Sequence, residues 1–149
     1  MRFPPKSWPV SSIVLVAFGA ALLVMGFYFM LLRPTLLPED LRYMGISSAQ
    51  INTAVPGLAA WVNRVFSVLG GYVFASGVLV ITLAATSFRT RQWPAAVGTL
   101  IAGAISIGWM VVINFAIDSD FRWVLLAVAL LWACSLVLFW FERARLQRG

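Results

Sequence analysis

Long apolar segments alternate with short polar ones along the chain, and this pattern predicts four membrane-crossing helices. We expect them over residues 10–32, 58–88, 94–117 and 123–141, with an outer loop at residues 33–57. The first segment carries no charge over about 23 residues, or about 34 Å of α-helix, which is enough to cross a bilayer. The predicted fold is therefore all-α: a four-transmembrane-helix bundle that forms one domain over residues 1–149.

The outer loop contains the signals of one further, short helix. Pro38 is followed by Glu39 and Asp40, and a proline with acidic residues is typical of the first turn of a helix. Gly45 is a common helix stop. We expect a short interfacial helix between these two signals.

A basic tail precedes the first apolar segment, so a signal peptide is the alternative to a retained helix. The apolar run is longer than a typical signal-peptide core, and no A-x-A-like cleavage site follows it. We therefore expect the first segment to remain as a transmembrane helix.

The second predicted helix is rich in small residues, which allow a neighbouring backbone to approach closely in a membrane. Those in its middle are Ser67, Gly70, Gly71, Ala75, Ser76 and Gly77. We predict that this helix is the packing spine of the bundle, and that Ala104 and Gly108 of the third helix contact it. Small-residue faces of this kind also suit a homo-oligomer or a protein partner.

The composition argues against a soluble domain and against several kinds of metal and redox chemistry. The chain is 62% hydrophobic and 11% charged, which is typical of an integral membrane protein. It has no histidine, which is the usual haem ligand and the commonest zinc ligand. Its single cysteine, Cys134, cannot form an intramolecular disulfide. We expect no metal and no cofactor.

Charged residues are divided unequally between the two ends of the predicted bundle. The amino tail, the second turn and the carboxyl tail carry Arg2, Lys6, Arg89, Arg91, Arg143, Arg145 and Arg148, with one acid, Glu142. The other end carries Arg33, Arg42, Arg64 and Arg122, with Glu39, Asp40, Asp118 and Asp120. The first end thus holds the whole net charge of +6, and the second sums to zero. By the positive-inside rule, both termini are predicted to be cytoplasmic.

Tryptophans flank the predicted spans, as residues of the membrane interface do. We assign Trp8, Trp93 and Trp140 to the inner interface and Trp61 and Trp123 to the outer one. The basic residues are interpreted as topology signals and contacts to anionic membrane lipids, and no nucleic acid is expected as a partner.

No Asp, Glu, Lys, Arg or His lies within the predicted spans away from their ends. Ion-coupled transporters and proton relays need such groups at membrane depth. Intramembrane hydrolases need a nucleophile with a base, or metal ligands. We therefore predict no catalytic residues and no enzymatic activity.

The outer end holds the best polar cluster of the sequence. Asn114, Asp118 and Arg122 are spaced four apart and share one face if the third helix persists. With them we group Asp120, Arg33, Arg42 and Arg64 as a candidate outer polar patch. One interpretation is a set of charge pairs that fixes the outer loop, and another is a recognition patch for a protein or a lipid headgroup. Calcium bound by Glu39, Asp40, Asp118 and Asp120 is a third, but the spacing fits no known calcium loop.

Aromatic residues inside the predicted spans outline a second candidate site. Tyr72, Trp109 and Trp132, together with Asn114, are candidates to line an apolar pocket for a lipid or another apolar molecule. The alternative interpretation is that they are bulky core or lipid-facing residues. We expect Asn114 to form a hydrogen bond to another helix.

Three stretches carry a resemblance to a known group of proteins. They are PEDLRYMG at residues 38–45, VFSVLGGYVFASG at 65–77 and INFAIDSDFRW at 113–123. With the four-helix layout, they resemble small bacterial inner-membrane proteins of the DoxX-like kind. The resemblance implies a compact four-helix bundle in a bacterial inner membrane and carries no activity to individual residues. It does not imply a redox role, since the chain has one cysteine.

These observations favour a non-enzymatic membrane protein. The leading hypothesis is an accessory, assembly or scaffold subunit of a larger membrane complex. The alternative is binding or transfer of an apolar small molecule or lipid between the helices, and a transporter or channel comes third.

Overall fold

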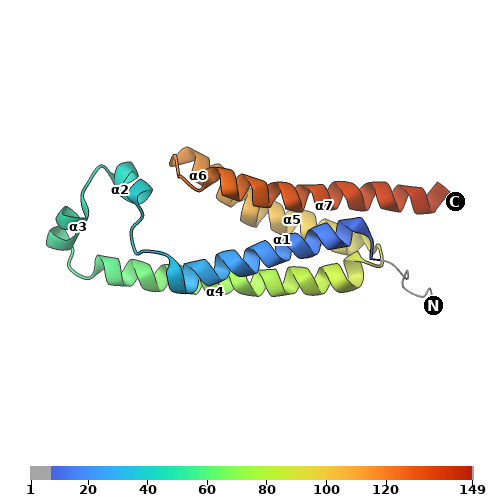
Figure 1. Ribbon diagram of the computed structural model, residues 1–149, viewed down its shortest axis with the longest axis horizontal. Helices are drawn as coiled ribbons and strands as arrows, with labels where there is room; N and C mark the ends of the chain where they lie inside the picture. The colour runs from blue at the N-terminus through green and yellow to red at the C-terminus, as the bar shows by residue number, and fades with distance from the viewer. Residues whose placement is uncertain (1–7, 149) are drawn as a thin grey trace.

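A computed structural model describes residues 8–148, and within them the secondary structure is entirely helical, without a strand. Among these residues, four helical segments are long and apolar enough to cross a membrane: Val10–Leu32, Leu58–Phe88, Trp93–Ala116 and Arg122–Gln147. They run along the long axis of the molecule, and two short helices lie beyond one end (Figure 1). The predicted all-α fold with four long apolar helices is confirmed.

The long segments begin and end close to the expected residues. The first is α1 (Val10–Phe27) with a wider π-helical turn, η1 (Tyr28–Leu32), and the second is α4 (Leu58–Leu83) with η2 (Ala84–Phe88). The third comprises α5 (Trp93–Gly103), η3 (Ala104–Gly108) and α6 (Trp109–Ala116). The fourth, α7 (Arg122–Arg148), continues past residue 141, because the polar residues that follow are good helix formers.

Two short helices occupy the outer loop, where the sequence pattern predicts one. The predicted helix is α2 (Pro38–Met44), which ends at Gly45 with φ +67°. The additional helix is α3 (Ser48–Ala54), and a capping box starts it. The backbone N–H of Gln50 donates to Ser47 Oγ (3.3 Å), and the backbone N–H of Ser47 donates to Gln50 Oε1 (2.8 Å).

We name the two ends of the bundle by what lies there. The loop end holds α2, α3 and the turn at residues 117–121, and the tail end holds Trp8, the turn at residues 89–92 and the end of α7 (Figure 1).

Four glycines bring α1 and α4 into close contact, and we call this interface the glycine seam. A Cβ on Gly26 would lie 2.5 Å from the backbone N of Phe74, and one on Gly70 would lie 2.7 Å from the backbone N of Met30. Further along, a Cβ on Gly77 would lie 2.8 Å from the carbonyl oxygen of Gly19. The second long helix is thus packed through Gly70 and Gly77 among its predicted small residues.

The third segment packs on α7 rather than on α4. The indole of Trp132 lies directly over Gly103, and its Nε1–H donates to the carbonyl oxygen of Thr99 (2.9 Å). The η3 turn that carries Ala104 and Gly108 packs on α7 in the same interface. The predicted contact of these two residues with the second helix is therefore wrong, because Trp132 fixes the third segment to α7.

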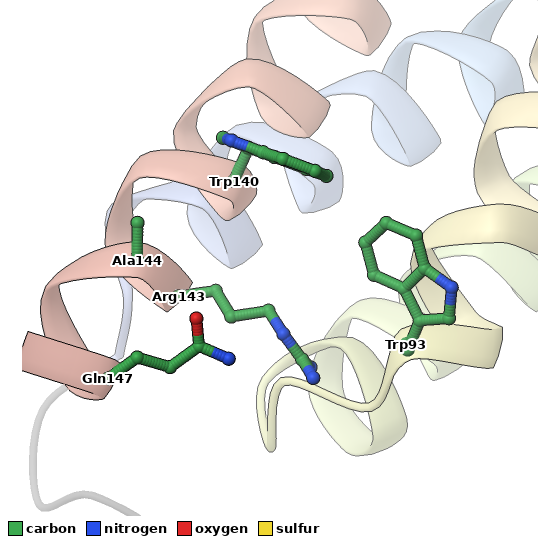
Figure 2. A pocket seen from close by; sticks show the side chains of 5 residues that line it. All are labelled: Trp93, Trp140, Arg143, Ala144 and Gln147. Carbon is green, nitrogen blue, oxygen red and sulfur yellow. The ribbon is translucent and has the colours of Figure 1, made fainter.

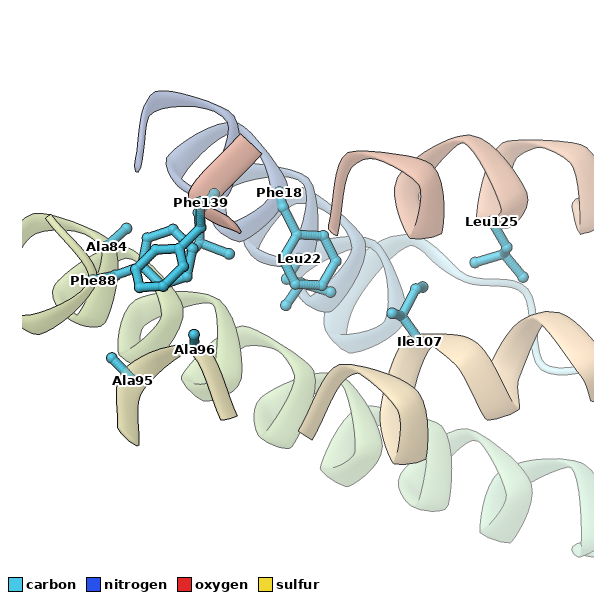
Figure 3. Packing of buried hydrophobic residues seen from close by; sticks show 10 residues of the cluster. Phe18, Leu22, Ala84, Phe88, Ala95, Ala96, Ile107, Leu125 and Phe139 are labelled. Atoms are coloured by element: carbon cyan, nitrogen blue, oxygen red, sulfur yellow. The ribbon is translucent and has the colours of Figure 1, made fainter. Parts of the chain in front are cut away.

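The hydrophobic core lies mainly toward the tail end (Figure 3). Phe88 and Phe139 have ring centroids 4.6 Å apart, and both side chains are fully buried. Ala84, Ala95 and Ala96 surround them, and Leu15 and Phe18 of α1 belong to the same cluster, so all four long segments meet in this core. Toward the loop end the core thins to Ile107 and Leu125. All four long segments are thus packed together at the tail end, whereas toward the loop end the tight contact is that between the first two segments across the glycine seam.

Candidate functional site

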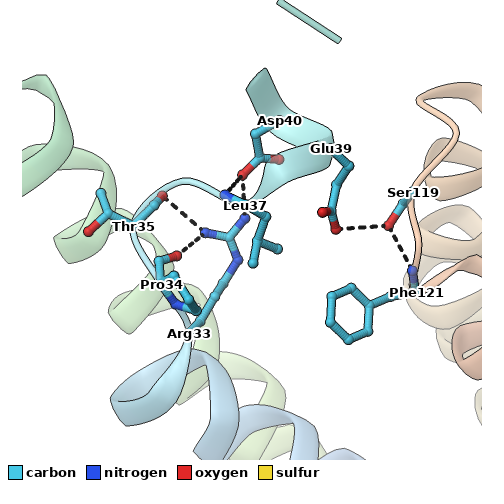
Figure 4. Close-up of polar contacts among 8 residues, drawn as sticks. All are labelled: Arg33, Pro34, Thr35, Leu37, Glu39, Asp40, Ser119 and Phe121. Carbon is cyan, nitrogen blue, oxygen red and sulfur yellow. Dashed lines mark hydrogen bonds and ion pairs between the residues drawn. The ribbon is translucent and has the colours of Figure 1, made fainter. Parts of the chain in front are cut away.

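Arg33 fixes the entrance to α2 at the loop end. It follows η1 and is buried, and its guanidinium donates to the carbonyl oxygens of Pro34 (2.9 Å) and Thr35 (3.2 Å). It also forms a salt bridge with Asp40 (2.9 Å), as Figure 4 shows. The charge lies 3.6 Å from the ring centroid of Phe66 on α4, a cation–π contact. Arg33 therefore ties the start of α2 to both α1 and α4.

Glu39 joins α2 to the opposite side of the bundle. Its side chain is directed at the turn before α7, where Ser119 Oγ donates to Glu39 Oε1 at 3.4 Å (Figure 4). Ser119 Oγ in turn accepts from the backbone N–H of Phe121 (3.2 Å). Glu39 is 3% exposed and Ser119 is 2% exposed, so a carboxyl group and a hydroxyl group are buried together. A carboxylate has about four acceptor positions, and here one long hydrogen bond occupies one of them.

Two charge pairs, both more exposed than Glu39 and Ser119, lie near this buried contact. Arg42 of α2 pairs with Asp120 (2.8 Å), and Arg122 at the start of α7 pairs with Asp118. The hydrogen bond that Arg42 donates to Asp120, together with the negative charges of Asp120 and Glu39, raises the pKa of Arg42. Exposed pairs of this kind contribute little to stability. The Arg42–Asp120 pair connects α2 with the turn at residues 117–121, whereas the Arg122–Asp118 pair joins that turn to the start of α7.

A cavity of about 720 Å³ lies beneath α2, between α1–η1 and α6–α7. Its walls are apolar: Tyr28 and Phe29 come from η1, Phe66 from α4, and Val124 and Val128 from α7. The polar groups are at the loop end, in a roof formed by Arg33, Glu39, Asp40, Asn114 and Ser119. The site is therefore amphipathic, with apolar side walls and a polar roof at the loop end.

The residues of the predicted outer polar patch do not form one site at the loop end. Arg33 and Asn114 line the cavity, whereas Arg42, Asp120, Asp118 and Arg122 form the outlying pairs. Arg64 is exposed on α4. The third helix ends at Ala116 and Asp118 has φ +53°, so Asn114, Asp118 and Arg122 do not share one helical face. Among the described residues, no group of acids converges as a metal site would require.

Asn114 does not form the predicted hydrogen bond to another helix. Its side-chain N–H donates to the carbonyl oxygen of Met110 (2.9 Å), one turn earlier in the same helix. The side chain of Asn114 is thus hydrogen-bonded within its own helix, and it also lines the cavity.

The three aromatic residues predicted to form an apolar pocket are not brought together. Tyr72 is 72% exposed and Trp109 is 62% exposed, so both lie on the outer surface of the bundle. Trp132 is packed on Gly103, and none of the three lines the cavity. Sequence reasoning missed Glu39, Ser119 and Phe66 as cavity residues, since residues that far apart carry no spacing signal.

The tail end contains a second polar cluster, which the sequence analysis treated as topology signals. Arg91, at φ +62°, pairs with Glu142 and donates to Ser11 Oγ (2.8 Å). Arg143 donates to the carbonyl oxygen of Arg91 (2.6 Å). Burial lowers the pKa of Arg91, and Glu142 partly offsets this. The cluster ties α1, the turn at residues 89–92 and α7 together; Arg2 and Lys6 lie outside the described residues.

A smaller hollow of about 200 Å³ lies beside this cluster. Trp93, Trp140 and Arg143 line it together with Ala144 and Gln147 (Figure 2). The two indoles meet edge to face with centroids 5.6 Å apart, which places the predicted interfacial tryptophans Trp93 and Trp140 at the same end. The hollow is shallow and small beside the cavity at the loop end.

The fold and the site define a helical protein with four potential membrane-spanning helices and one large amphipathic cavity at the loop end. Comparison of the chain with protein-family models, with curated proteins and with solved structures finds no match.

Proposed function

We propose that this protein binds an amphipathic molecule in the cavity at the loop end. The observation that carries the proposal is the cavity of about 720 Å³ with apolar walls and a buried polar roof. Pockets for small ligands have volumes of about 300–1,000 Å³ and combine apolar walls with a few placed polar groups. The proposed ligand lays its apolar part between α1 and α7 and its polar end against α2.

The proposal includes a location in the membrane. Large apolar side chains such as Ile13, Leu79, Ile105 and Leu130 are exposed along the four long segments, and lipid would cover them. The charge asymmetry supports a four-pass protein with both termini in the cytoplasm. The resemblance noted above favours a bacterial inner membrane. In this orientation the cavity lies in the outer half of the bundle.

The cavity changes the order of the functional hypotheses. An accessory or scaffold subunit remains a prediction, since the exposed face of α4 suits bilayer lipid as well as a partner protein. A transporter remains third because the polar groups are confined to the roof and do not continue along the cavity. Ligand binding is the function that a specific feature of the site favours.

Filling the cavity with a bulky side chain tests the proposal. Ala21 on α1 lines the cavity, whereas its neighbour Ala20 is exposed and does not line it. Native mass spectrometry of the gently extracted protein should show a bound small molecule in the wild type and in Ala20→Phe. Ala21→Phe should lose it. Equal amounts of the bound molecule in both variants would overturn the proposal.

A further inference from the structure

Glu39 uses less of its hydrogen-bonding capacity than the neighbouring acid of the roof. Asp40 accepts from the Arg33 guanidinium and from the backbone N–H of Leu37, both at 2.9 Å. Glu39 accepts one hydrogen bond from Ser119 at 3.4 Å, although its side chain is buried. A buried acceptor without full partners is costly. The cavity beneath Glu39 is the place from which a further donor has room to approach.

The charges around the roof also single out Glu39. Three arginines of the loop end pair one-to-one with aspartates: Arg33 with Asp40, Arg42 with Asp120, and Arg122 with Asp118. Among the residues from 8 to 148, no salt bridge reaches Glu39. The fourth arginine, Arg64, is exposed and does not line the cavity. Glu39 therefore lines the cavity as an acid without a salt bridge, whereas Arg33, the buried cation of the roof, already pairs with Asp40.

We propose that Glu39 binds the primary amine of an amphiphile with an apolar chain that occupies the cavity. This inference rests on the proposed function and adds the chemistry of the headgroup. An ammonium group has three donors and no acceptor, so it matches the unused acceptor positions of a carboxylate and neutralises its charge. The carboxylate of a fatty acid would instead face a like charge at Glu39.

The test compares amphiphiles that differ only in the headgroup. The full chain is placed in phosphatidylcholine nanodiscs, which contain no primary amine, and native mass spectrometry measures the binding of hexadecylamine, hexadecanol and hexadecanoate. Hexadecylamine should bind about tenfold more tightly than hexadecanol. Glu39→Gln should remove that preference and leave hexadecanol binding unchanged, which also shows that the variant is folded.

Asp120→Asn is the matched control, because it removes one acid of the same end outside the cavity. The preference for the amine should survive in this variant. A separate arm adds phosphatidylethanolamine to the nanodiscs: displacement of hexadecylamine would identify a membrane lipid as the source of the amine, and retention would identify a free amphiphile.

The outcomes separate the two proposals. Equal binding of the amine and the alcohol, or tighter binding of hexadecanoate, would overturn the role of Glu39 and leave the binding cavity intact. If none of the three amphiphiles binds above the level of the filled variant, Ala21→Phe, the proposed function fails as well.

Discussion

The two sides of the first long helix are built in opposite ways. On one side, the glycine seam brings α1 so close to α4 that a single added Cβ would lie 2.5 Å from a backbone atom. On the other side, near the loop end, large side chains such as Tyr28 and Phe29 line a cavity of about 720 Å³ between α1 and α7. The first side holds the bundle together, and the second leaves room for a ligand.

The difference between the two sides of α1 shows how a small helical protein can combine tight helix packing with a cavity. Backbone contact across glycines is strong packing in a membrane, where no hydrophobic force drives helices together. The tail end adds the Phe88–Phe139 core and the Arg91–Glu142 cluster. With α1 fixed by these contacts, the gap at the loop end does not need to close.

Adding one methyl group to the seam should break this arrangement, and we expect it to have the largest effect. In Gly70→Ala the new Cβ meets the backbone of Met30, so the variant should lose about 2–3 kcal/mol of unfolding free energy in a detergent denaturation assay. Gly71→Ala is the control, because a Cβ there meets nothing within 4 Å. It should gain about 0.5–1 kcal/mol from helix propensity. Equal effects of the two variants would contradict the seam.

Removing the anchor of the roof should loosen α2 without separating α1 from α4. In Arg33→Met the buried end of the Arg33–Asp40 salt bridge is lost, and the local stability of α2 should fall by about 2 kcal/mol. Hydrogen exchange should then be faster in Pro38–Met44 and unchanged in α4 around Gly70. Unchanged protection of α2 would show that Arg33 does not hold the roof.

Enlarging a residue on the cavity side should be tolerated. Ala21→Phe places an aromatic ring where space exists, so the unfolding free energy should change by less than about 1 kcal/mol. The same denaturation assay checks this result against Gly70→Ala. A loss as large as that of the seam variant would mean that the two sides of α1 are equally packed.

The smallest effect is expected at the exposed pair between α2 and the last turn. Arg42→Gln should leave the stability of the protein unchanged, because exposed charge pairs are screened by water and salt. Thermal unfolding at low and high salt measures this. A clear loss at low salt would show that the roof depends on this pair as well as on Arg33.

The sequence predicted the features that depend on local patterns and missed those that depend on side-chain direction. The long apolar runs, Pro38 and Gly45 predicted the helices and α2, and the glycines of α4 predicted a close helix contact. The prediction that α4 is the packing spine of the bundle is wrong, because α4 packs mainly on α1, and it is α1 that contacts both α4 and α7. The second short helix, α3, also has a local signal, the Ser47-x-x-Gln50 capping box at its start, but the prediction of a single loop helix did not include it.

The candidate site shows the limit of the same reasoning. Tyr72 and Trp109 were selected for their depth in the spans, but depth does not state which face of a helix points inward, and both are exposed. Glu39 was interpreted as a helix-start residue, and its contact with Ser119, 80 positions away, depends on how the bundle folds.

Photolabelling with an alkylamine that carries a diazirine on its chain would show directly whether the cavity at the loop end binds an amphiphile. The full chain in phosphatidylcholine nanodiscs is labelled, digested and mapped by mass spectrometry. Labels should concentrate on cavity residues such as Phe29 and Val128, and they should be lost when unlabelled hexadecylamine competes. Labels spread evenly over exposed residues such as Leu79 and Ile105, unaffected by the competitor, would contradict a binding cavity.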